Sequence, residues 1–142
     1  MSKGRFRVYP LEGLYPEGER LVLDPQRILT RLASGRGDGQ QCVIIEQACF
    51  TEMQLYLLDP LLASYPDYCP LETLLAAYRN VSVEQCRVCL NRAFEWGTAS
   101  QVLRGVYLLL TACRPKMRVL GLETRYISET GYMLFAANGQ HR

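Results

Sequence analysis

Hydrophobic and polar positions alternate over short stretches in the first fifty residues. These stretches cover residues 5–9, 20–23, 27–32 and 41–50, and each is short enough for a β-strand. Prolines and glycines separate them, and the glycine-rich run over residues 34–39 is typical of a turn. The pattern predicts a small antiparallel sheet. The stretch 27–32 also fits a helical turn, because its hydrophobic residues lie at helical spacing as well.

The hydrophobic period changes to that of a helix at residue 51. Thr51 fits an N-cap, and the leucines that follow it recur at intervals of three and four up to about Ser64. The apolar face consists of Leu55, Leu58, Leu61 and Leu62. Because a proline inside a helix removes a hydrogen bond, Pro60 predicts either a kink or two shorter helices.

Two further helices are expected over residues 71–78 and 83–96. Pro70 suits the first turn of the former. Ser82 and Gln85 have the spacing of a capping box for the latter, and Gly97 ends it. The predicted apolar stripes are Leu71, Leu74, Leu75 and Tyr78 in one helix and Val83, Cys86, Leu90 and Ala93 in the other. Trp96 is expected to pack into the core at the helix end.

A fourth helix is predicted to start near Thr98 or Ser100 and to run to Gly121. Its stripe repeats at intervals of three and four and consists of Val102, Val106, Leu110, Cys113 and Met117. Pro115 predicts a bent or separate last turn. From residue 122 the period returns to two, so two strands joined near residues 128–131 form a hairpin.

This order of elements predicts an α+β protein with a single domain over residues 1–142. It divides into an N-terminal sheet (1–49), a helical core with an extra helix near 82–96 (50–121), a hairpin (122–136) and a frayed tail (137–142). The length of 142 residues with 49% hydrophobic and 21% charged residues fits one globular domain. The net charge is only +2, but residues 98–142 carry six basic and two acidic residues. The basic surplus therefore belongs to the C-terminal third.

The sequence offers little for catalysis or metal binding. The single histidine is His141, and the glycine run lacks the lysine and following helix of a phosphate-binding loop. Cys86 and Cys89 have metal or redox spacing, but no second pair follows, so core packing is favoured and a redox role stays open. No apolar run reaches the roughly 18 residues of a membrane span, and no secretion signal is evident. We expect a cytoplasmic protein that has no enzymatic activity, cofactor, metal or membrane contact.

Two blocks of sequence resemble the OmpR/PhoB-type effector domain of bacterial response regulators. Residues 111–134 are similar to the end of that domain, where a basic run closes a helix and a wing ends with Gly-Tyr. The matching residues are Arg114, Lys116, Met117, Gly121, Gly131 and Tyr132. Phe50-Thr51 with the later Pro66 resembles the start and end of the family's first helix. The resemblance implies a winged helix-turn-helix with an N-terminal sheet.

The resemblance also implies a function. The helix before the wing would enter the major groove of double-stranded DNA, and the wing would touch the minor groove or backbone. The residues implied to face DNA are Arg104, Tyr107, Leu108, Thr111 and Arg114 on the helix, Lys116, Arg118 and Arg125 near phosphates, and Ser128 in the wing. At 142 residues the chain has no room for the family's phosphoacceptor domain as well. We therefore expect a transcription regulator that acts without one.

Two alternatives remain open. Leu108 and Leu109 make the DNA-facing side apolar, and Glu129 puts a carboxylate in the wing, which favours a degenerate winged helix that serves protein association or dimerisation. The second alternative is that the recognition helix is formed by residues 82–96 instead of 102–120. Its polar face would then consist of Arg87, Asn91 and Arg92.

Overall fold

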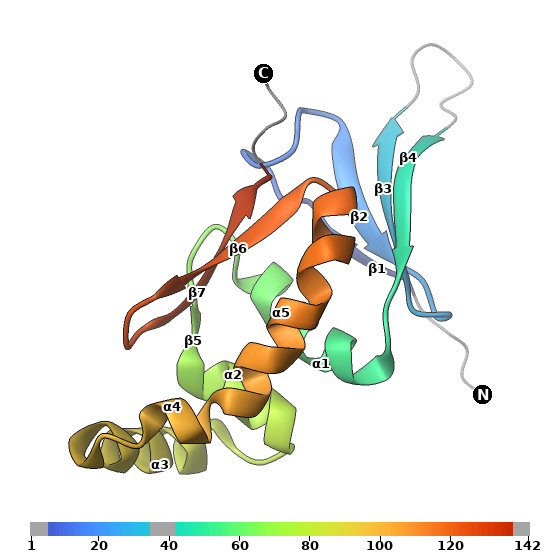
Figure 1. Ribbon diagram of the computed structural model, residues 1–142. Helices are drawn as coiled ribbons and strands as arrows, with labels where there is room; N and C mark the ends of the chain where they lie inside the picture. Colours follow the sequence, from blue (N-terminus) through green and yellow to red (C-terminus); the bar gives the residue numbers. More distant parts are fainter. Residues whose placement is uncertain (1–5, 35–41, 138–142) are drawn as a thin grey trace.

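The computed structural model describes residues 6–34 and 42–137. Within these ranges the chain forms two antiparallel sheets and five helices, which confirms the predicted α+β class. Figure 1 shows the four-stranded sheet on one side, the β6–β7 hairpin on the other and helices between them. His141, residues 35–39 of the turn expected over 34–39, and residues 138–142 of the tail expected over 137–142 lie outside the described residues.

The first sheet is formed by β1 (Arg7–Tyr9), β2 (Glu19–Leu23), β3 (Ile28–Ser34) and β4 (Cys42–Cys49) in sequence order. The stretch that also fitted a helical turn is therefore strand β3. Alternation places Leu21 and Leu29 in the core. In β4, by contrast, nearly every side chain is exposed on both faces of the strand.

Helix α1 (Glu52–Ser64) starts at the predicted cap, where Thr51 accepts a hydrogen bond from the backbone N–H of Gln54 and the Gln54 side chain accepts one from the N–H of Thr51. The helix continues through Pro60 to Ser64. Leu57 is buried beside the predicted face, whereas Leu55 is only partly buried. The apolar stripe is therefore turned slightly from the predicted one.

The predicted hairpin gains a third strand that the sequence did not predict, which makes it a second sheet. β5 (Cys69–Pro70) pairs with β7 (Gly131–Ala136), which also pairs with β6 (Leu122–Ile127). A Cβ atom at Gly131 would lie 2.1 Å from the carbonyl oxygen of Cys69. Glycine at this position is what lets β5 come close enough to pair.

Helix α2 (Leu71–Arg79) is followed by α3 (Val83–Trp96), which has the predicted capping box and ends at Gly97 in the left-handed conformation. Two predictions for α3 are wrong. Trp96 is 70% exposed rather than packed in the core, and Val83 is also exposed. The reason is that α3 packs only on α2 and the following short helix, so nothing lies over its outer end.

The predicted fourth helix is two helices. α4 (Ala99–Val102) ends at Leu103, and α5 (Arg104–Val119) then starts without a side-chain cap. α5 continues through Pro115, so the last turn is not separate. The predicted stripe within α5 is buried as expected and comprises Val106, Leu110, Cys113 and Met117.

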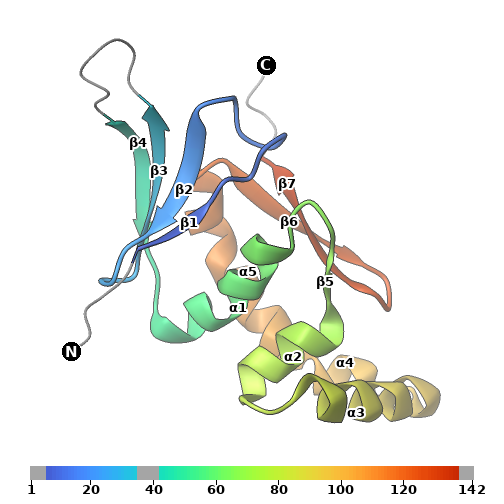
Figure 2. The same ribbon diagram turned by 180° about the vertical axis from the view of Figure 1, so that it is seen from behind.

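Helices α1 and α5 lie between the two sheets, while α3 and α4 project at the far end (Figures 1 and 2). Side chains of both sheets, α1, α2, α3 and α5 share one hydrophobic core, to which α3 contributes Cys86 and Leu90. The Tyr15 hydroxyl donates a 2.6 Å hydrogen bond to the carbonyl oxygen of Leu120, which ties the N-terminal segment to the end of α5. The body is thus continuous from β1 to β7. Within the described ranges, no helix has the length and apolar character to cross a membrane.

Candidate nucleic-acid interface

Helix α5 turns one row of side chains away from the core. Every member of the row that was predicted to face DNA is exposed, namely Arg104, Tyr107, Leu108, Thr111 and Arg114. The exposed fractions of Tyr107 and Leu108 are 57% and 51%. Since the opposite stripe of the helix is buried, this orientation is fixed by the packing of α5 on α1 and α2.

Leu109 does not belong to the exposed row. It is partly buried and packs against the hydrophobic core. It lies three residues after Val106 and four before Cys113, which puts it at the edge of the buried stripe. Of the two leucines expected to form an apolar contact surface, Leu108 is therefore exposed and Leu109 is only partly so.

Three basic residues near the end of α5 differ in the contacts that their charged groups make. Lys116 points to α1, where its amino group lies 3.3 Å from Oε1 of Gln54 and 5.3 Å from the ring centre of Phe50. Arg114 and Arg118 both approach Oε2 of Glu123 in β6, at 3.6 and 3.3 Å. Lys116 is thus held against the body, and one carboxylate partly neutralises the two arginines.

The hairpin presents Arg125 and Ser128 to solvent. The Arg125 guanidinium lies 4.7 Å from the ring centre of Phe135 on the neighbouring strand. At the tip Glu129 has a φ angle of 58°, in the left-handed region, and its N–H donates to the Tyr126 hydroxyl at 3.0 Å. The tip is therefore ordered by Tyr126, and it carries a carboxylate instead of the basic residue common in the family that the sequence resembles.

A cavity of about 370 Å³ separates the start of α5 from the hairpin. Tyr107 of α5, Tyr126 of β6 and Tyr132 of β7 line it together with Arg104. The rings of Tyr126 and Tyr132 are 5.3 Å apart and tilted by 54°. Burial, with smaller contributions from Tyr126 and Tyr107, raises the pKa of Tyr132 to about 12. Arg104 is in no ion pair within the described part of the chain.

The sequence prediction missed this cavity and the part played in it by Tyr126. The only signal was the cross-strand register, since Tyr126 pairs directly with Tyr132 in the antiparallel hairpin. Residues opposite each other in a hairpin share a face. The contribution of α5 depends on the tertiary arrangement and had no counterpart in the local pattern.

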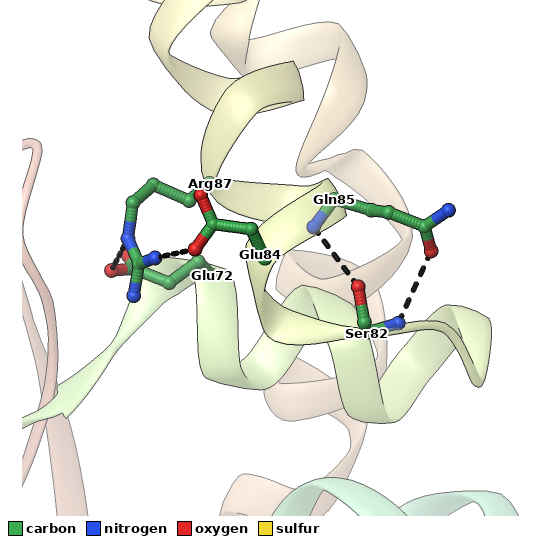
Figure 3. Close-up of polar contacts among 5 residues, drawn as sticks. All are labelled: Glu72, Ser82, Glu84, Gln85 and Arg87. Carbon is green, nitrogen blue, oxygen red and sulfur yellow. Dashed lines mark hydrogen bonds and ion pairs between the residues drawn. The ribbon is translucent and has the colours of Figure 1, made fainter.

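The alternative recognition helix, α3, has a polar face that is partly engaged. Figure 3 shows the Arg87 side chain between Glu84 of α3 and Glu72 of α2, and the Arg87–Glu72 distance is 3.6 Å. The same view shows the reciprocal hydrogen bonds of Ser82 and Gln85. Asn91 and Arg92 are exposed, with Arg92 6.0 Å from the ring centre of Trp96. Arg87 therefore fastens α3 to α2.

The six cysteines form no disulfide in the described segments. Cys86 is buried and Cys89 partly buried, and both thiols are free. Burial raises the pKa of Cys86, which lowers the fraction of reactive thiolate. No group of three or more potential metal ligands lies together among the residues that the structure describes.

Comparison of the chain with protein-family models, curated proteins and solved structures gives no match.

Proposed function

We propose that this chain is a cytoplasmic winged-helix DNA-binding protein that regulates transcription. The observation that carries the proposal is the exposed row of α5, which is continuous in the chain with the β6–β7 hairpin. A helix of 16 residues is about 24 Å long and fits a major groove about 12 Å wide. In this arrangement the hairpin is the wing that reaches the adjacent backbone.

The exposed row has the chemistry for contacts with both backbone and bases. Arg104 is free to approach a phosphate or a guanine edge, and Arg114 can exchange its ion pair with Glu123 for a phosphate. Thr111 and Leu108 between them offer a hydroxyl and an apolar contact for a thymine methyl group. Because the Lys116 side chain contacts Gln54 and Phe50, we do not propose it as a phosphate contact.

The packing favours α5 over α3 as the recognition helix. α5 packs on α1, α2 and β6, so its exposed row has a fixed position relative to the hairpin. α3 packs on α2 and α4 only, and its Arg87 is engaged with Glu72. Recognition needs side chains that are held in register with the groove, which α5 supplies.

The test is fluorescence anisotropy with a random-sequence duplex of about 30 base pairs, titrated over a salt series. We expect micromolar binding at low salt that weakens steeply as salt rises, because bound arginines release counterions from DNA. The double variant Arg104→Ala/Arg114→Ala should bind at least tenfold more weakly and with a shallower salt dependence.

The matched control is Arg27→Ala/Arg79→Ala, which removes the same charge from exposed positions in the β2–β3 turn and on α2. It should retain most of the affinity. Equal losses in the two double variants would point to bulk charge, and no binding at low salt would overturn the proposal. In that case the alternative of a protein-association module is tested with Leu108→Glu, which should then abolish association.

A further inference from the structure

The cavity between α5 and the hairpin has a composition unlike that of the neighbouring hollows. Its walls are apolar or aromatic except for Ser100, and Arg104 is the one charged residue among the lining side chains. The hollow beside it, between α2, α3 and the hairpin tip, is lined by Glu72, Glu129 and Arg87 instead. The tyrosine-lined cavity therefore has a positive rim with no carboxylate to balance it.

The tyrosines give the cavity aromatic walls from three elements. Tyr132 is 8% exposed and lies deep in the cavity, whereas Tyr107 and Tyr126 are about half exposed and lie nearer its opening. Leu71 and Val106 are almost fully buried and complete the apolar part. Aromatic walls favour flat ring systems, which gain from offset or edge-to-face contacts with them.

The positive charge of Arg104 favours a negatively charged ligand. Arg104 lies in the first turn of α5, a 16-residue helix that has no side-chain cap at this end. A guanidinium together with the positive end of a helix attracts an anionic group such as a carboxylate. A cationic ligand would find no counter-charge among the lining residues.

We propose that this cavity binds a small planar aromatic anion, and that the bound anion competes with DNA. The volume of about 370 Å³ is enough for a two-ring molecule. Its rings lie against Tyr107, Tyr126 and Tyr132, and its carboxylate pairs with Arg104. Competition rests on the proposed DNA-binding function, because Arg104 and Tyr107 belong to both sites. The ligand site itself is independent of it.

The first test uses 2-naphthoate as the probe and isothermal titration calorimetry on the full chain. We expect saturable binding, with Arg104→Gln and Tyr107→Ala each weakening it about tenfold or more, because a charged hydrogen bond or a stacked ring is lost. Arg114→Gln is the matched control: it lies on the same helix but outside the cavity, and should leave naphthoate binding unchanged.

Two further probes separate the ring from the charge. Cyclohexanecarboxylate keeps the charge but lacks the aromatic ring, and 2-naphthamide keeps the rings but lacks the charge. Both should bind at least tenfold more weakly than 2-naphthoate. Equal binding of all three, or binding that survives both Arg104→Gln and Tyr107→Ala, would overturn the site. So would a complete lack of naphthoate binding.

The second test adds 2-naphthoate to the protein–duplex complex and measures anisotropy. A fall in bound duplex that is lost in Tyr126→Ala but kept in Arg79→Gln supports competition, because Tyr126 lines the cavity and neither residue belongs to the DNA-facing row of α5. If naphthoate binds but the protein has no affinity for DNA, the ligand site stands while the proposed function and the competition both fail. If DNA binds without any response to bound naphthoate, only the competition is overturned.

Discussion

Helices α3 and α5 have similar lengths but are held in place by different forces. α3 has a capping box at Ser82 and a left-handed glycine at Gly97, and it packs on α2 and α4 only. α5 has no side-chain cap, but it packs on α1, α2, β4 and β6 and buries four residues in the main core. α3 also buries Cys86 and Leu90 in that core, but caps define both of its ends, whereas α5 has no side-chain cap and depends on packing.

The difference bears on function. A helix that is fixed by the core on one side can present the other side in a constant position, as a groove-binding surface requires. A peripheral helix that is fastened by caps and an ion pair can open without unfolding the domain. The comparison predicts that α5 unfolds with the whole protein and that α3 opens on its own.

The largest effect should come from truncating equivalent core leucines of the two helices. Leu110→Ala in α5 should lower the free energy of unfolding by about 3–5 kcal/mol, because it leaves a cavity among packed elements. Leu90→Ala in α3 should cost less, about 2–3 kcal/mol, because the peripheral helix can move into the space. Urea denaturation measures both. Equal losses would show that α3 is as much part of the main core as α5.

The buried cysteine thiols of the two helices should make different contributions to the loss of stability at alkaline pH. Burial raises the pKa of Cys113 in α5 from 9.0 to about 11. Between these values the unfolded chain has lost the thiol proton while the folded chain keeps it, so stability is full below pH 9 and falls as pH rises. The loss is about 1 kcal/mol at pH 10.

The pH dependence is measured by urea denaturation at pH 8 and pH 10. Cys113→Ala should flatten it by that amount, since the variant has no thiol at this position to titrate. Cys86→Ala in α3 is the matched control and should flatten it less. The same slope in wild type and in Cys113→Ala would contradict the assignment.

Removing one cap tests whether α3 depends on local chemistry. Ser82→Ala should cost about 1 kcal/mol, because the N–H of Gln85 loses its acceptor. Hydrogen exchange should show the loss as faster exchange confined to α3. Thr51→Ala removes the same kind of cap from α1 and is the control. Because α1 lies in the core, that variant should accelerate exchange throughout the domain.

The same contrast explains which parts of the fold were predictable. The ends of α3 were predicted because Ser82, Gln85 and Gly97 signal them within a few residues. The break at Leu103 and the two-residue strand β5 were missed, because neither has a local signal and both depend on contacts with distant segments. Trp96 was placed wrongly since periodicity gives the direction of a side chain, not whether another element covers it.

The candidate site shows a similar limit. The exposed row of α5 followed from the period of the stripe opposite it. Leu109 is only partly exposed, because its spacing from Val106 and Cys113 puts it beside that stripe. The contacts of Lys116 with Gln54 and Phe50 join segments more than 60 residues apart, and no pattern in the sequence reports them.

The smallest expected effect tests how strongly Glu123 neutralises the arginines at the end of α5. Glu123→Gln removes the carboxylate that Arg114 and Arg118 share, so both become free for phosphates. Exposed ion pairs contribute at most about 1 kcal/mol, so affinity for a random duplex should rise only about two- to fivefold. Its salt dependence should become steeper, because more counterions are released.

Glu84→Gln in α3 is the matched control, since it changes the net charge equally but frees only Arg87, which keeps Glu72 as a partner. An equal gain in the two variants would mean that overall charge, not the position of α5, sets the affinity. A gain confined to Glu123→Gln would locate the DNA contact at the end of α5 beside the wing. The two helices would then differ in function as they do in packing.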